Sequence, residues 1–109
     1  MNTIEIHIAR DFSPMPGGRD PTEGDNSGEE FLNRILLPKF KEAVEQNARL
    51  LVDFDDTEGY ATSFLEAAFG GLARQFNDND ILKLLEFKSA DEPFVIEEVM
   101  MYIRNARNK

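Results

Sequence analysis

The chain opens with a strict alternation of apolar and polar residues. Residues 3–8 read TIEIHI, which places Ile4, Ile6 and Ile8 on one side of an extended chain. A period of two is typical of a β-strand that buries one face against a core. We therefore predict a strand over residues 3–8. His7, the only histidine of the sequence, falls on the polar face, so we expect it to be exposed and not to act as a ligand.

Two shorter apolar runs predict two further strands. Residues 50–54 read LLVDF, a continuous run typical of a strand that is buried on both faces of a parallel sheet. Residues 81–87 read ILKLLEF, for which we predict a third strand, with a helical turn as the alternative.

Three other segments repeat their apolar residues at helical spacing. Ser27 opens the first, and Glu30 stands three residues later, as a capping box requires. Pro38 interrupts this segment and predicts a kink or two short helices. Ser63 and Glu66 form a second capping box before the second segment, and a serine and a glutamate at the same spacing precede the third. The apolar residues of the three segments are Phe31, Ile35, Leu36, Phe40 and Val44; Leu65, Ala68, Phe69, Leu72 and Phe76; and Ile96, Val99, Met100 and Ile103.

The order of these elements predicts the fold class. Residues 13–28 hold three prolines and four glycines, which indicates a long loop between the first strand and the first helix. Strands that alternate with helices are typical of an α/β domain with a mainly parallel sheet. We predict one compact domain over residues 1–109, with a loop over residues 13–26 and helices packed on a mainly parallel or mixed sheet of about four strands. Gly70 and Gly71, inside the second helical segment, predict a close approach of that helix to the sheet; a helix that ends and reforms there is the alternative.

Composition narrows the functional classes. The 109 residues include 12 basic and 21 acidic side chains, for a net charge of −9. Nucleic-acid binding depends largely on Lys and Arg that neutralise phosphates, so we expect none here. Without cysteine and with one histidine, the chain should hold no thiolate or histidine-rich metal site, and we expect no cofactor. No apolar run approaches roughly 20 residues and no signal peptide is recognisable, so we expect a cytoplasmic protein without membrane contact.

The string LLVDFDDT over residues 50–57 resembles the first motif of the haloacid-dehalogenase-type phosphatases, an apolar strand followed by Asp-x-Asp-x-Thr. The resemblance implies Asp53 as a nucleophile, Asp55 as a general acid or base, and a magnesium ion held by the pair, roles that carboxylates can fill. That family also needs a later lysine and a further acidic pair. Lys83 and Asp91 are the candidates, but neither lies in a fitting motif. We therefore expect no enzyme activity and keep a small magnesium-dependent phosphatase as an alternative.

A longer resemblance covers most of the chain. Its pieces follow one another in order: GGR at residues 17–19, SGEEF at residues 27–31, VDFD at residues 52–55 and EGYATSFLEAAFGGL at residues 58–72. In these pieces the sequence resembles the STAS-like domain family of bacterial and phage-borne proteins, which is itself similar to the anti-sigma-factor antagonists. The resemblance implies a compact regulatory domain that binds proteins and does not catalyse a reaction.

The anti-sigma-factor antagonists also imply a switch. Their Asp-rich turn leads to a helix start, Asp-Ser-Ser-Gly-Leu, in which an ATP-dependent partner kinase phosphorylates one serine. Residues 61–65, ATSFL, take that place here, so the resemblance implies Thr62 as the phosphorylated position and Ser63 as its neighbour. Ala61 and Phe64 depart from the Asp and Gly of that pattern. The implied partner is an ATP-binding protein of the histidine-kinase-like class.

We predict the binding surface at one end of the sheet. A backbone nest over residues 17–19, beside a guanidinium, would bind a phosphate or a partner's carboxylate; a flexible loop is the alternative. The acidic balance leaves one more class open, an acidic inhibitor or nucleic-acid mimic, and the oligomeric state is open as well. The candidate partner-binding or phosphorylation residues are Arg19, Asp55, Asp56, Glu58, Tyr60, Thr62 and Ser63.

Overall fold

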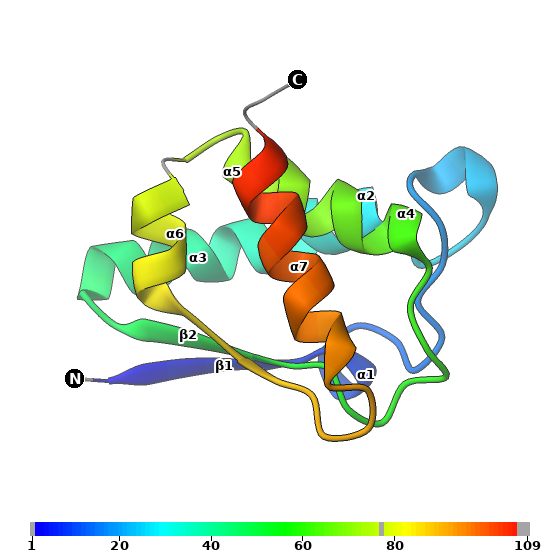
Figure 1. The fold of residues 1–109 in the computed structure, drawn as a ribbon, viewed down its shortest axis with the longest axis horizontal. Helices are drawn as coiled ribbons and strands as arrows, with labels where there is room; N and C mark the ends of the chain where they lie inside the picture. Colours follow the sequence, from blue (N-terminus) through cyan, green and yellow to red (C-terminus); the bar gives the residue numbers. More distant parts are fainter. Residues whose placement is uncertain (1, 77, 107–109) are drawn as a thin grey trace.

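Three parallel strands form the sheet, in the order β1-β2-β3 (Figure 1). The computed structural model describes residues 2–76 and 78–106, without the side chains of residues 78 and 79. In chain order the described elements are β1 (Thr3–His7), α1 (Ile8–Asp11), η1 (Pro21–Glu23), α2 (Gly28–Phe31), η2 (Leu32–Leu36), α3 (Leu37–Gln46), β2 (Arg49–Asp53), α4 (Thr62–Leu65), η3 (Glu66–Gly70), α5 (Gly71–Ala73), α6 (Asp78–Leu84), β3 (Leu85–Lys88) and α7 (Phe94–Asn105).

The predicted α/β class is confirmed, but the sheet has three strands over the described residues where we expected about four. All three run parallel, with Ile4 opposite Leu50 and Leu50 opposite Leu85. A sheet of consecutive parallel strands needs a crossover between each pair, and the helical segments supply it. Because the strands are parallel, their carboxyl ends all lie at the same edge of the sheet.

The helices cover only one face of this sheet (Figure 1). Leu50 and Val52 of β2 are fully buried on that face, whereas Leu51 between them is half-buried on the other. The prediction that β2 is buried on both faces was therefore wrong. The open face carries ion pairs instead, Arg49 with Glu86 and, at 3.7 Å, Asp53 with Lys88.

The first helical segment begins as predicted. The Ser27 hydroxyl accepts a hydrogen bond from the Glu30 backbone N–H at 3.1 Å, which caps α2. Pro38 does not split the segment, because the π-helical stretch η2 lies directly before it. A wider turn at this point accommodates a residue that lacks an N–H and whose ring crowds the preceding turn. The segment therefore continues through α3 to Asn47, which ends it in the left-handed conformation.

The third strand is shorter than predicted. Residues 81–84 belong to α6, and only Leu85–Lys88 pair with β2. Ile81 and Leu85 are both buried, and their spacing of four suits one face of a helix as well as an apolar run. The helical alternative was therefore correct for the first half of this segment.

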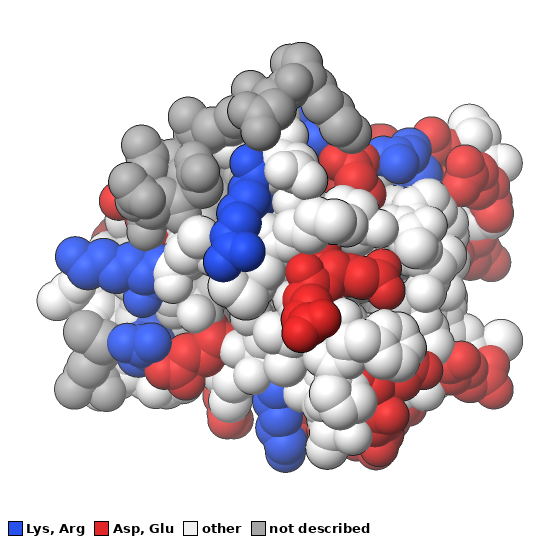
Figure 2. All heavy atoms as spheres, in the orientation of Figure 1, with Lys and Arg blue, Asp and Glu red and all other residues white. Residues whose placement is uncertain are grey.

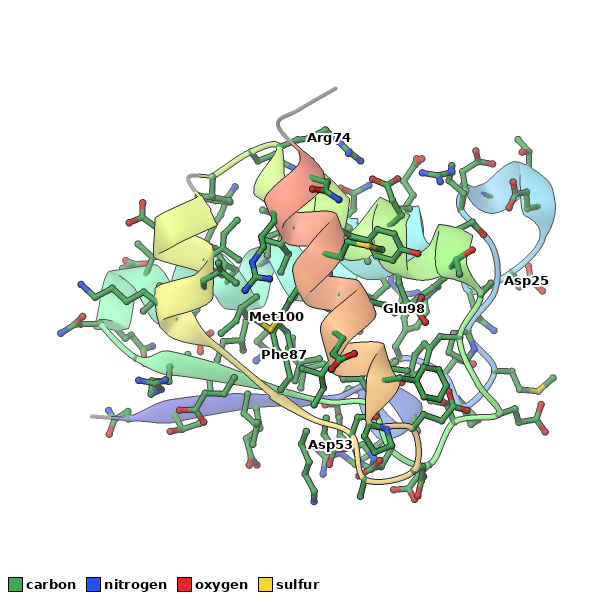
Figure 3. The ribbon with its side chains drawn as sticks, viewed as in Figure 1. Asp25, Asp53, Arg74, Phe87, Glu98 and Met100 are labelled. Carbon is green, nitrogen blue, oxygen red and sulfur yellow. The ribbon has the colours of Figure 1, made fainter. Side chains whose placement is uncertain are left out.

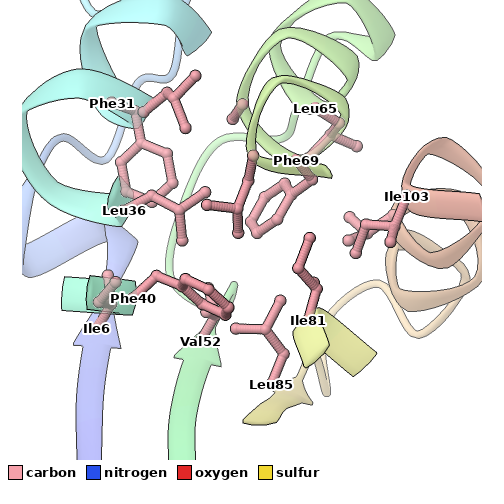
Figure 4. Packing of buried hydrophobic residues seen from close by; sticks show 14 of the residues in the cluster. Ile6, Phe31, Leu36, Phe40, Val52, Leu65, Phe69, Ile81, Leu85 and Ile103 are labelled. Carbon is pink, nitrogen blue, oxygen red and sulfur yellow. The ribbon is translucent and has the colours of Figure 1, made fainter. Parts of the chain in front are cut away.

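A hydrophobic core fills the space between the sheet and the helices (Figure 4). Gly71 allows the close approach predicted for the second helical segment, but the neighbour is a helix and not the sheet. A Cβ at this position would stand 2.7 Å from a methyl group of Leu32 in η2. Across the described residues, no helix is long and apolar enough to cross a membrane.

Candidate functional site

The carboxyl ends of the three strands gather three short segments at one edge of the sheet. They are His7 at the end of β1, the Asp-rich turn after β2, and the loop that follows β3. Asp53 lies beside the loop that leads into α7 (Figure 3). Residues that the sequence separates by 35 or more positions can therefore bond directly here.

The aspartates of the turn divide into internal and exposed groups. Asp53 accepts the backbone N–H of Asp55 at 2.9 Å, and Asp55 accepts the backbone N–H of Asp91 at 2.9 Å. Asp91 in return accepts the backbone N–H of Asp56 at 3.1 Å. Asp55 is buried, while the side chain of Asp56 is 71% exposed. Asp53, Asp55 and Asp91 therefore hold the backbone of the turn in place, and Asp56 faces outward.

His7 also takes part in this arrangement. It lies on the polar face of β1, as predicted, but its side chain is only 22% exposed, so the expected exposure was wrong. Its Nε2 lies 3.1 Å from a carboxylate oxygen of Asp56 and 3.2 Å from the carbonyl of Asp55. Asp56 has a left-handed backbone with φ of 73°, and the contact with His7 helps to hold it there.

Asp53 and Lys83, which the phosphatase alternative needs together, lie at opposite ends of the sheet. The two oxygens of the predicted nucleophile Asp53 face the backbone of the turn and, at 3.7 Å, the ammonium of Lys88. Lys83 precedes β3 and so lies at the amino end of that strand, opposite the edge where Asp53 stands. Over the part of the chain that the structure describes, no three His, Asp or Glu side chains are arranged to hold a metal ion.

Tyr60 is an internal support of the turn. Its hydroxyl donates a hydrogen bond to the carbonyl of Phe54 at 2.7 Å, and its ring meets that of Phe54 edge to face, with centroids 5.5 Å apart. Burial raises the pKa of Tyr60 above the ordinary value of the phenol; the Thr57 hydroxyl lowers it by less, and the charges of Asp53 and Asp55 add smaller effects that raise it. Its half-buried side chain therefore fixes the path of the chain through the turn.

Tyr60→Phe should make the protein less stable and less sensitive to alkali. Loss of the hydrogen bond to the Phe54 carbonyl should lower the free energy of unfolding by about 1 kcal/mol near neutral pH. Since the phenol holds its proton more tightly in the folded state, its contribution is complete below pH ~10 and is lost as the pH rises further. Urea unfolding at several pH values should show a shallower alkaline decline in the variant. Parallel declines in both proteins would contradict a buried Tyr60.

Thr62 and Ser63 lie at the start of α4, but Ser63 does not cap the helix. Ala61 is the N-cap, and its carbonyl accepts the N–H groups of Phe64 at 3.1 Å and Leu65 at 3.3 Å. Ser63 is therefore the second helical residue and is half-buried, so the predicted capping box with Glu66 was wrong. The tertiary contacts of the turn, such as the 2.9 Å bond from the Glu58 N–H to Pro14, set where the helix begins. Thr62 is exposed.

Glu66 instead pairs with two arginines. Arg19 approaches one carboxylate oxygen at 2.5 Å, and Arg74 approaches the other at 2.9 Å. Two of the three N–H donors of the nest predicted over residues 17–19 are occupied, because the Gly17 N–H bonds to Asn26 at 2.8 Å and the Arg19 N–H bonds to Glu23 at 2.8 Å. Arg19 therefore fastens the long loop to η3 and does not lie in the Asp-rich turn.

A contact between α4 and α7 was not predicted from the sequence. The hydroxyl of Tyr102 lies 3.4 Å from a carboxylate oxygen of Glu98, which projects from α7 on the side of α4 (Figure 3). Burial raises the pKa of Tyr102, the charge of Glu98 raises it further, and a hydrogen bond with the Thr62 hydroxyl acts in the opposite direction. Thr62 is the first residue of α4, which packs against α7. Helical periodicity alone gave no signal for this pairing.

These features define a class: a small α/β domain that presents an acidic turn and a helix start at the carboxyl ends of a parallel sheet. The family model described as a STAS-like domain of unknown function matches residues 27–94, and the chain belongs to this family. The suspected family is thus confirmed. No curated protein and no solved structure matches the chain.

Proposed function

We propose that this protein is a non-catalytic regulatory module that binds a protein partner. Its binding surface is formed by Asp56, Glu58 and Thr62, which we call the turn surface. All three residues are exposed, and they follow one another over the turn and the first residue of α4. Membership of the STAS-like family supports a regulatory role of this kind.

The proposal rests on one observation: some polar side chains of the turn bond to the protein's own backbone, whereas others are exposed. Asp53, Asp55 and Tyr60 direct their polar groups at backbone atoms of the protein itself. Asp56 and Glu58, in contrast, are exposed on a backbone that these groups hold in place. A preorganised exposed turn loses little conformational entropy when a partner binds it, which favours a recognition role.

We further propose that phosphorylation of Thr62 releases the partner. An ATP-binding protein of the histidine-kinase-like class would transfer the γ-phosphoryl group of ATP to the Thr62 hydroxyl, with ADP as the leaving group and the hydroxyl proton taken up by a base on the kinase. The phosphate adds roughly −1.5 to −2 charges at neutral pH. Asp56, Glu58 and Glu98 already make this region acidic, so the added charge should repel these carboxylates and reorder the turn that the partner binds.

Calorimetric titration of the purified protein against each purified protein encoded near its gene tests the proposal. We expect one neighbour to bind. Thr62→Glu should weaken that binding at least tenfold, which corresponds to about 1.4 kcal/mol. Thr62→Val should leave the affinity within about twofold of wild type. Incubation with the neighbour and ATP should phosphorylate the wild type and not Thr62→Val, as read by intact-mass spectrometry.

Glu45→Gln, an exposed carboxylate on α3, is the matched control for Glu58→Gln. Only the change in the turn should alter the affinity. Absence of binding by every neighbour would contradict the proposed function. Equal effects of the two glutamine variants would contradict the turn surface as its site.

A further inference from the structure

The outer side of α7 carries an apolar pair that the fold does not use. Phe94 is 58% exposed and Met101 is 45% exposed. Seven residues are close to two helical turns, so these side chains lie on the same side of α7, about 10 Å apart along its axis. The opposite side of the helix, with Val95, Val99 and Ile103, is buried in the core. Over the described residues, the other large apolar side chains with such exposure are Met15 and Val44, on other elements.

Two carboxylates lie between the members of this pair. Glu97 and Glu98 follow Phe94 by three and four residues and precede Met101 by four and three, which places them on the same side of the helix. Figure 2 shows acidic atoms over the middle of α7, with uncharged atoms around them. We call Phe94, Glu97, Glu98 and Met101 the α7 stripe. It combines exposed apolar surface with negative charge.

The α7 stripe is continuous with the turn surface. Glu98 lies beside Tyr102 on α7, and α7 packs against α4, whose first residue is Thr62. A shallow hollow of about 170 Å³ opens next to Met101, and its lining includes Tyr102 and the carboxylate-bearing Glu66. A molecule seated on the stripe would therefore reach Thr62, and a phosphate there would stand at its edge.

We propose that the α7 stripe is the docking surface for a basic amphipathic helix of a partner protein. Two apolar anchors that are two turns apart match the spacing of apolar side chains on a helix laid along α7. The glutamates between them favour lysine or arginine on that helix, and they disfavour an acidic one. The inference rests on the proposed function and adds to it the chemistry of the partner.

A titration with synthetic peptides tests this surface directly and does not require the natural partner. The isotope-labelled protein is titrated with two amphipathic helical peptides that share one leucine pattern, one carrying lysines on its polar side and the other glutamates. Chemical-shift changes in nuclear magnetic resonance spectra report where each peptide binds. We expect the lysine peptide to bind at least tenfold more tightly than the glutamate peptide, and its shift changes to centre on the α7 stripe and Thr62.

Matched variants separate the stripe from the general acidity of the protein. Phe94→Ser/Met101→Ser should lower the affinity for the lysine peptide at least fivefold. Val44→Ser removes a similarly exposed apolar side chain from α3 and should leave that affinity within twofold of wild type. Glu97→Gln/Glu98→Gln should weaken binding by more than Glu42→Gln/Glu45→Gln, which removes the same number of negative charges. All of these side chains lie at the surface, so thermal unfolding should confirm that every variant is folded.

The inference would be overturned by shift changes centred on the open face of the sheet, by equal affinity for both peptides, or by equal effects of the stripe and control variants. A change in molecular mass in solution on Phe94→Ser/Met101→Ser would overturn it as well, because it would make the stripe a contact between copies of this chain. If a genomic neighbour binds elsewhere on the domain, only the stripe is refuted. If no neighbour binds, the proposed function fails while the peptide result still stands.

Discussion

Phe69→Ala is expected to lower the free energy of unfolding by about 3–5 kcal/mol, the usual cost of deleting a fully buried aromatic ring. The ring of Phe69 is completely buried, and its centroid lies 5.6 Å from that of Phe54 and 6.2 Å from those of Phe31 and Phe87. These neighbours belong to α2, to the end of β2 and to β3. Figure 4 shows the ring pointing from η3 into the space between the helices.

The functional consequence lies in Phe54, whose carbonyl accepts the hydrogen bond from Tyr60. A cavity at Phe69 would weaken the packing of Phe54, which supports the acidic turn, as well as the packing of the core. Since a domain of this size has a total stability of roughly 5–15 kcal/mol, the variant should lose at least about a fifth of it.

Urea unfolding followed by far-ultraviolet circular dichroism measures this effect. Phe94→Ala is the matched control, because the same ring is 58% exposed there and its removal should cost under about 0.5 kcal/mol. If the two alanine variants had equal unfolding midpoints, Phe69 would not be the centre of the aromatic cluster.

Gly28→Ala should lower the free energy of unfolding by about 1–3 kcal/mol, although alanine favours helices more than glycine does. A Cβ on Gly28 would stand 2.4 Å from the carbonyl oxygen of Phe64 and 3.1 Å from the Cβ of Ala67. The first of these is a backbone atom of α4, which cannot rotate away. The two helices would have to separate, and α4 carries Thr62 at its start.

Gly71→Ala serves as the control for Gly28→Ala. Its added methyl group would meet only the tip of the Leu32 side chain within 3.5 Å, and that side chain can move. We expect its cost to be smaller than that of Gly28→Ala, both by urea midpoint and by melting temperature. A reversed order would show that α2 and α4 are not in tight backbone contact. Spectral shifts at Thr62 in Gly28→Ala would show the displacement of α4 directly.

The position of Gly28 also accounts for part of the resemblance on which the family prediction rested. The SGEEF and SFLEAAF pieces lie far apart in the sequence, yet Ser27 caps α2 and Gly28 packs against Phe64 and Ala67 of the second piece. Residues that two short motifs share with a family can thus be explained by a single helix contact. Their presence predicted the fold correctly, and this contact by itself says nothing about the partner.

The sequence by itself determined the elements whose pattern reports one-sided burial. The alternation in residues 3–8 predicted β1, and helical spacing after Ser27 predicted the first helix with its cap. Each of these depends on neighbours within a few positions, where sequence spacing and spatial distance are closely related.

The tertiary structure alone decided which polar groups of the turn face outward. Asp55 and Tyr60 were candidate contact residues, but the first bonds to Asp91 and the second to Phe54, and both are held within the domain. Strand order brings Asp91 to Asp55, and a sequence pattern does not encode strand order. The same holds for α4, which begins at Thr62, because α7 packs across η3 and α4.

The start of α4 and the open face of the sheet both depend on contacts between residues that are far apart in the sequence, which local patterns do not show. A serine followed three residues later by glutamate is compatible with a cap, but bonds from distant residues fix the chain before Ala61 and start the helix one residue after it. An apolar run shows that a strand contacts a core, yet the placement of every helix decides whether one face or two are covered. Here one face is covered, and ion pairs occupy the other.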